Sequence, residues 1–242
     1  MPADAPTILA TSGGIKNGRR TRFEFGELTE YALELSGVDG RTPKMCFLAT
    51  ALGDNPMIIT AFYEAALIRG VAPSHLALFP MPNIEDVTAH LLDQDVVFVF
   101  GGSVAGLLAM WRLHGVDEAM RAAWQAGVVL TGGSAGSICW HLGGTTDSFG
   151  PDLRAVTDGL GFLPHSNGVH YDSEARRRPL FQSLIADGTL PAGYATDDGV
   201  GLLYRGTEFA EAVSERDGQG AYRVERGADG RAVEARIDPR RL

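Results

Sequence analysis

The sequence predicts an α/β fold in which a mostly parallel sheet is covered by helices on both faces. Short apolar segments alternate along the chain with segments of helical spacing, as in successive strand–helix–strand units. The clearest strand, residues 96–100, is apolar at every position, which is typical of a strand buried on both faces. Two glycine turns, at 101–103 and 132–136, follow predicted strands and precede predicted helices.

Four strands are expected in the first hundred residues, and each is a short apolar run. The first runs into Ser12-Gly13-Gly14, the second ends near Gly53-Asp54-Asn55-Pro56, and the fourth stops at Gly101-Gly102-Ser103. These glycine, proline and aspartate clusters are turn signals. The four predicted strands are residues 7–10, 45–50, 75–79 and 96–100.

Helices are expected where apolar residues recur three or four positions apart. Four such segments are residues 27–35, 57–69, 104–113 and 116–125. Residues 127–131 then form a further strand, which leads through a glycine turn into a short helix over 135–141.

The second half of the chain has weaker patterns. Residues 143–168 are rich in Gly, Pro, Asp and Ser, so we expect a long structured loop of the kind that often carries function. A helix at 179–185 and strands at 194–196 and 200–204 follow. Asp217-Gly218 and Asp229-Gly230 suit hairpin turns. With no linker or repeat, we expect one α/β domain over 1–242, whose tail, 205–242, forms short hairpins on it.

The composition limits the possible partners and the compartment. With 30 acidic and 21 basic residues among 242, the net charge is −9, which argues against nucleic acid or an anionic membrane as the main partner. Cys46 and Cys139 lack metal-ligand spacing and make no disulfide framework. The N-terminus has no signal-peptide pattern. We therefore expect a cytoplasmic protein without a metal or cofactor.

A possible nucleophile lies in Gly132-Gly133-Ser134-Ala135-Gly136. A serine at a tight strand-to-helix corner needs small neighbours, and its hydroxyl projects at the carboxyl edge of the sheet. The Ala135 amide could then donate to a developing oxyanion, joined by the Gly102 amide if the two strands are neighbours. The alternative is an ordinary glycine turn, which could hold a phosphate through its amides.

A serine nucleophile needs a general base and an acid that orients it. Of the six histidines, His165 and His170 lie in the irregular segment after the nucleophile, and we favour His170 as the base. Two aspartates compete as the orienting acid. Asp198 follows a predicted strand and is the preferred candidate, whereas Asp147 lies on the loop after the nucleophile helix.

Several motifs together resemble the peptidase E family, the aspartyl dipeptidase family of serine peptidases related to cyanophycinase. They are Phe100-Gly101-Gly102-Ser103, Gly132 to Ser137, Thr145-Thr146-Asp147, Gly161-Phe162-Leu163-Pro164 and His170-Tyr171-Asp172-Ser173-Glu174. The resemblance implies a three-layer fold like that of class I glutamine amidotransferases, with Ser134 as nucleophile and His170 as base. It places the acid at Asp147 or at Asp198, where the family usually has glutamate. It also implies a homo-oligomer.

The resemblance also suggests how substrate binds. Peptidase E cleaves dipeptides with N-terminal aspartate, and an arginine after the catalytic histidine binds that side chain. Arg176, Arg177 and Arg178 follow His170 at a similar but shorter spacing. We therefore expect a serine exopeptidase of short peptides, with N-terminal Asp as one possible preference. The alternatives are a cyanophycinase-like enzyme, a broader aminopeptidase or an esterase on the same scaffold, and a non-catalytic relative that binds a small anion.

Overall fold

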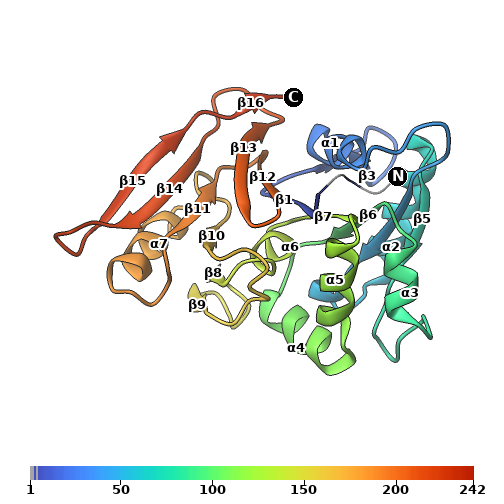
Figure 1. Cartoon of the computed structure of the whole chain (residues 1–242), viewed down its shortest axis with the longest axis horizontal. Coiled ribbons are helices and arrows are strands. Elements are labelled where there is room, and N and C mark those ends of the chain that lie inside the picture. The colour runs from blue at the N-terminus through green and yellow to red at the C-terminus, as the bar shows by residue number, and fades with distance from the viewer. Residues whose placement is uncertain (1–2, 4) are drawn as a thin grey trace.

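An eight-stranded sheet forms the centre of the computed structural model, which describes residue 3 and residues 5–242. The strand order is β16-β13-β12-β1-β7-β6-β4-β5 (Figure 1). The five strands from β1 to β5 in this order are mutually parallel, whereas β12 pairs antiparallel with both β1 and β13. The strands are β1 (Thr7–Thr11), β4 (Lys44–Leu48), β5 (Ala72–His75), β6 (Val96–Val99), β7 (Val129–Gly133), β12 (Val200–Arg205), β13 (Glu208–Ser214) and β16 (Arg240–Arg241).

Helices cover both faces of this sheet. Successive side chains of a strand point to opposite faces, and the sheet strands accordingly contribute alternate residues to two cores. Leu9 and Phe47 pack with α1 (Glu27–Leu35) and α2 (Pro56–Arg69), whereas Ile8 and Cys46 belong to the core on the other face. That other face is covered by α3 (Val87–Leu92), α4 (Val104–His114), α5 (Val116–Gln125) and α6 (Ala135–Ile138). The predicted α/β fold with a mostly parallel central sheet is confirmed.

A second sheet has six strands, in the order β15-β14-β11-β10-β8-β9. The helix α7 (Arg177–Ala186) packs on it through Phe181 and Ile185. The strands of this second sheet are β8 (Gly143–Thr146), β9 (Arg154–Val156), β10 (Ser166–Gly168), β11 (Gly193–Thr196), β14 (Ala221–Arg226) and β15 (Ala232–Ile237). A small hairpin of β2 (Ile15–Asn17) and β3 (Phe23–Phe25) lies between β1 and α1 in sequence.

The expectation of a long loop at 143–168 is wrong, because three strands of the second sheet lie there. Backbones approach so closely in this sheet that a Cβ at Gly143 would collide with the Val156 carbonyl, and one at Gly144 with the Asn167 carbonyl. Glycine is required for this packing, yet it carries no hydrophobic alternation that a sequence pattern could reveal.

Smaller differences concern element ends and turns. The strand expected at 75–79 lies earlier, at β5, and the helix expected over 135–141 ends at Ile138. Asp229-Gly230 does turn a hairpin, between β14 and β15. Asp217-Gly218 does not, because the chain there leaves the central sheet after β13 and enters the second sheet at β14. Among the described residues, no helix has the length and apolar character that would let it cross a membrane.

Candidate active site

Ser134 stands at a strained corner between β7 and α6. Its φ of 57° and ψ of −115° lie outside the regions that residues with a Cβ ordinarily adopt. The Ser134 amide donates to the Thr11 carbonyl at 3.1 Å, which ties the corner to β1. A Cβ at either Gly132 or Gly136 would collide with the carbonyl oxygen of Val99 on β6. The glycines of the motif are therefore required by packing against the neighbouring strand.

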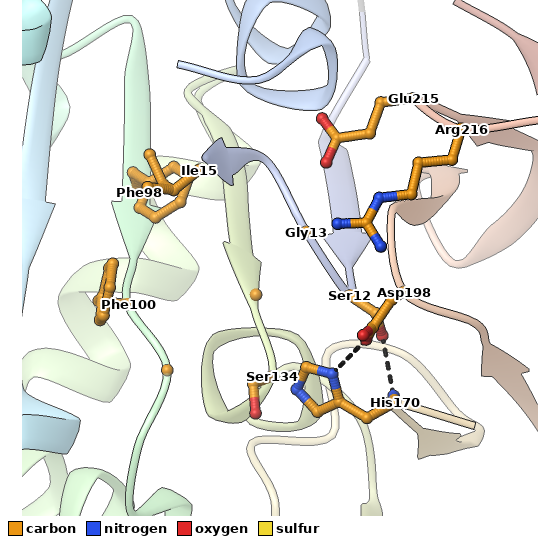
Figure 2. Close-up of a pocket in the computed structure, with 12 residues that line it drawn as sticks. Ser12, Gly13, Ile15, Phe98, Phe100, Ser134, His170, Asp198, Glu215 and Arg216 are labelled. Atoms are coloured by element: carbon orange, nitrogen blue, oxygen red, sulfur yellow. Dashed lines mark hydrogen bonds and ion pairs between the residues drawn. The ribbon is translucent and has the colours of Figure 1, made fainter. Parts of the chain in front are cut away.

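Ser134 lines a cavity of about 310 Å³ at the carboxyl ends of β1, β7 and β6. Open parallel sheets commonly bind ligands at this edge. Figure 2 shows Ser134 between two different walls. One wall is apolar, with Ile15, Phe98 and Phe100; the other carries His170, Asp198, Glu215 and Arg216.

His170 enters the cavity from the loop that follows β10. Its φ is 53°, and its backbone amide donates to Ser12 Oγ at 3.3 Å. On the ring, Nδ1 lies 2.6 Å from Asp198 Oδ1 (Figure 2). Because a carboxylate only accepts, Nδ1 carries the proton and Nε2 is left as an acceptor. Figure 2 shows the ring between Asp198 and Ser134, so the acceptor nitrogen is available on the serine side.

The turn that carries Asp198 is held by neighbouring polar groups. The Asp198 amide donates to Asp172 Oδ1 at 2.9 Å, and Gln219 bridges Asp172 and the Asp198 carbonyl. The buried Asp197 accepts from the Gly220 amide at 2.8 Å and from the Tyr222 hydroxyl at 3.2 Å. Burial raises the pKa of Asp197. Sequence reasoning assigned no role to Asp172 or Asp197, although both stand beside predicted site residues.

The other acid and base candidates lie elsewhere. Asp147 is exposed on the loop after β8 and lies outside the cavity lining. His165 packs its ring against Tyr194 and Tyr204 and is likewise absent from the lining. The structure thus brings together Ser134, His170 and Asp198, and leaves Asp147 apart.

The two amides expected to hold an oxyanion occupy adjacent turns. Ala135 is the first residue of α6, and Gly102 follows the neighbouring strand β6. Among the described residues, neither amide donates a hydrogen bond to a protein acceptor. Gly102 has a φ of 134°, and a Cβ there would collide with the Ala51 carbonyl. Gly101 rather than Gly102 lines the cavity.

The substrate-binding role expected for Arg176, Arg177 and Arg178 is corrected by their positions, because none of them lines the cavity. The Arg177 side chain is 3% exposed, and it donates to Glu174 and to the Thr145 carbonyl. Arg176 donates to the Pro151 carbonyl and to Asp152.

Arg178, the third of these arginines, is paired with Glu234 and stacks over Tyr171 and Tyr222. The side chains of Arg176, Arg177 and Arg178 are therefore engaged by other protein groups at the start of α7.

The structure places a different arginine, Arg216, in the cavity, next to Glu215. Both residues follow β13, which reaches the site because β13 pairs with β12 and β12 pairs with β1. No spacing in the sequence relates them to Ser134, which is why sequence reasoning missed them.

The cysteines lie in the core and away from the cavity. Both are fully buried, and burial raises the pKa of the Cys46 thiol to about 12 and also raises that of Cys139. A thiol whose pKa lies so far above neutral pH stays protonated and is not a nucleophile. Within the described part of the chain, no three His, Cys, Asp or Glu side chains gather as metal ligands would.

Comparison with solved structures supports the fold. A crystal structure of a peptidase from an acI-B1 Actinobacterium superposes with a TM-score of 0.69 at 15% identity, covering 97% of this chain and 95% of that one. The crystal structure of a putative peptidase E protein from Listeria monocytogenes EGD-e gives a TM-score of 0.57 at 17% identity, covering 84% of this chain and 96% of the other.

Comparison of sequences gives the family. The chain is 43% identical over 217 residues to the uncharacterized peptidase YgaJ of Bacillus subtilis (strain 168), covering 90% of this chain and 91% of the relative. It is 28% identical over 165 residues to peptidase E of Shewanella denitrificans, covering 64% and 69%. The expected resemblance to peptidase E is thereby confirmed. Since the profile of peptidase family S51 also matches residues 8–212, the chain belongs to that family.

Proposed function

We propose that this peptidase is a serine exopeptidase that hydrolyses dipeptides or short peptides through an acyl-enzyme on Ser134. One observation carries the proposal. In the cavity at the carboxyl edge of the sheet, the ring of His170 lies between Ser134 and the carboxylate of Asp198, with Nδ1 bound to Asp198 Oδ1 at 2.6 Å. This is the order of nucleophile, base and orienting acid that acyl transfer requires.

In the first half-reaction, Ser134 Oγ attacks the scissile carbonyl and its proton passes to His170 Nε2. Asp198 stabilises the imidazolium that forms and keeps the ring in the reactive tautomer. When the C–N bond breaks, Nε2 returns the proton to the leaving amine. Water then attacks the ester on Ser134, again with His170 as base, and the acid product leaves with Ser134 restored.

The oxyanion would be held by backbone amides. The Ala135 amide belongs to the residue after the nucleophile, and the Gly102 amide lies on the neighbouring turn; neither is engaged by another protein group in the described part of the chain. Donors fixed in the backbone need no reorganisation as charge develops, and the loss of one such donor typically slows turnover by about 100-fold or more.

The size of the cavity supports short substrates. Its volume of about 310 Å³ lies at the lower end of the range for small-molecule sites, about 300–1,000 Å³. A preference for N-terminal Asp gains no support from Arg176, Arg177 and Arg178, because they lie outside this cavity.

The decisive experiment joins activity with chemical labelling. A fluorophosphonate probe should label Ser134 of the wild-type protein and should not label Ser134→Ala. The same variant should lose about 1,000-fold or more in kcat on dipeptides that the wild-type protein cleaves, with unchanged thermal unfolding. A panel of dipeptides, longer peptides, simple esters and aspartyl-arginine polymer distinguishes a peptidase from an esterase or a cyanophycinase-like enzyme. Full activity in Ser134→Ala would rule out the mechanism.

A further inference from the structure

Arg216 presents to the cavity a guanidinium that has no partner in the part of the chain that the structure describes. The Arg216 side chain passes over Gly199. A Cβ at position 199 would lie 2.9 Å from Arg216 Cδ, so glycine there leaves room for the arginine. Gly199 directly follows Asp198, which brings Arg216 beside the His170–Asp198 pair (Figure 2). Among the described residues, the guanidinium makes no hydrogen bond and no ion pair, whereas Arg177 and Arg178 are both paired with glutamates.

The adjacent carboxylate, that of Glu215, is engaged by backbone amides and forms no ion pair with Arg216 within the described part of the chain. Glu215 accepts from the Gly14 amide at 3.2 Å and from the Leu28 amide at 3.3 Å. Leu28 lies in the first turn of α1, so Glu215 caps that helix end, where a negative charge is favoured. A Cβ at Gly26 would collide with the same carboxylate. Because Glu215 is held in this way, Arg216 remains available to an anion that enters the cavity.

The chemistry of acyl transfer assigns a side of the cavity to each half of the substrate. The base that removes the serine proton later protonates the leaving amine, so the leaving residue must lie on the His170 side of Ser134. Arg216 is on that side, and Ile15, Phe98 and Phe100 form the opposite wall (Figure 2). The acyl side of the substrate therefore meets an apolar wall, while the leaving side meets a guanidinium.

We propose that Arg216 binds the C-terminal carboxylate of the leaving amino acid and so makes the enzyme select dipeptides with a free C-terminus. In a dipeptide the leaving residue carries that carboxylate one residue from the scissile bond, and a guanidinium can take it bidentately. A carboxylate on an N-terminal Asp would instead face the apolar wall. The inference rests on the proposed function, since it uses His170 to define the leaving side.

The test compares three substrates: Leu-Ala, its amide Leu-Ala-NH2, and Asp-Ala-NH2, whose acidic side chain is its sole carboxylate. We expect the wild-type enzyme to prefer Leu-Ala over Leu-Ala-NH2 by about 10- to 100-fold in kcat/KM, chiefly through KM, the range expected for a charge-assisted pair. In Arg216→Met the ratio should fall toward one. Arg176→Met, which removes an arginine outside the cavity, should keep the wild-type ratio.

Two outcomes would overturn the proposal. Equal cleavage of the acid and the amide by the wild-type enzyme would show that no C-terminal carboxylate is bound. A preference for Asp-Ala-NH2 over Leu-Ala-NH2 that disappears in Arg216→Met would assign the guanidinium to the N-terminal side chain instead.

Calorimetry on Ser134→Ala separates this inference from the proposed function. If Leu-Ala binds this variant about 10-fold or more tightly than Leu-Ala-NH2, and the added Arg216→Met change abolishes the difference, Arg216 is the carboxylate anchor whatever reaction follows. Equal binding of both ligands overturns the anchor, even if Ser134 is labelled and dipeptides are cleaved.

Discussion

His170 Nδ1 lies 2.6 Å from Asp198 Oδ1, although the two residues come from loops after different strands of the second sheet. A second link runs back between the same loops, from the Asp198 amide to Asp172 Oδ1 at 2.9 Å. Two hydrogen bonds therefore join the two loops, one through the His170 ring and one through Asp172, two residues later in the chain. This arrangement fixes the ring while leaving Nε2 facing the side of Ser134 (Figure 2).

Asp198→Asn should slow dipeptide hydrolysis by about 100- to 10,000-fold in kcat, because an amide can donate to Nδ1 and so favour the wrong tautomer. Asp147→Asn is the matched control. Asp147 is exposed and lies outside the cavity, so this variant should keep wild-type kcat. Steady-state kinetics on both purified variants tests the assignment, and the reverse pattern would make Asp147 the acid.

Ser134→Gly should be as inactive as Ser134→Ala but more stable than it by about 1 kcal/mol. The backbone at 134, with φ 57° and ψ −115°, costs about 1–3 kcal/mol for a residue with a Cβ. Glycine removes this strain from the folded state. It also makes the unfolded chain more flexible, which cancels part of the gain in stability. Urea unfolding of the two variants measures the difference. If Ser134→Gly were the less stable of the two, the corner would not be strained.

The elements that depend on local pattern could be predicted from the sequence. β6 lies within the predicted 96–100, and α1 and α5 begin and end where helical spacing placed them. Ser134 and His170 could be predicted as site residues because a glycine corner and a histidine in a strand-to-helix segment are local features, and both line the cavity. The choice between Asp147 and Asp198 stayed open, because it depends on which loop returns to His170.

What could not be predicted depends on contacts between distant segments. Gly143 and Gly144 form a strand because they meet the Val156 and Asn167 carbonyls, and isolated glycines give no strand signal. Arg216 reaches the cavity through the pairing of β13, β12 and β1. This placement depends on strand pairing, which spacing in the sequence does not reveal. Distance from His170 along the chain therefore favoured Arg176, Arg177 and Arg178 instead.

Gly136→Ala should destabilise the protein by about 3 kcal/mol or more, because its Cβ would collide with the Val99 carbonyl, and backbone in a central strand cannot move aside. Gly106→Ala is the matched control on a helix. There the nearest atom is Ser103 Oγ at 3.1 Å, the end of a small side chain, so the change in unfolding free energy should stay within about 1 kcal/mol. Similar losses in both variants would contradict this account of the motif.

His141 should make the protein lose stability as the pH falls below neutral. Its side chain is fully buried, and its Nδ1 lies 2.9 Å from the Ser137 carbonyl. Burial lowers the pKa of His141 from 6.5 to about 3. Below pH 6.5 the unfolded chain therefore takes up a proton that the folded protein does not. The free energy of unfolding should fall with decreasing pH by about 1.4 kcal/mol per pH unit from this residue, down to its folded pKa.

The variant His141→Asn isolates this contribution, because the asparagine amide can still donate to the Ser137 carbonyl but takes up no proton. At pH 7.5 both proteins are neutral at this position, and the difference between them gives the packing cost of the substitution alone. Between pH 6 and 4.5 urea unfolding should show a steeper loss for the wild-type protein, by about 1.4 kcal/mol per pH unit. Parallel curves would mean that His141 is charged in the folded state, which its burial against the Tyr204 ring opposes.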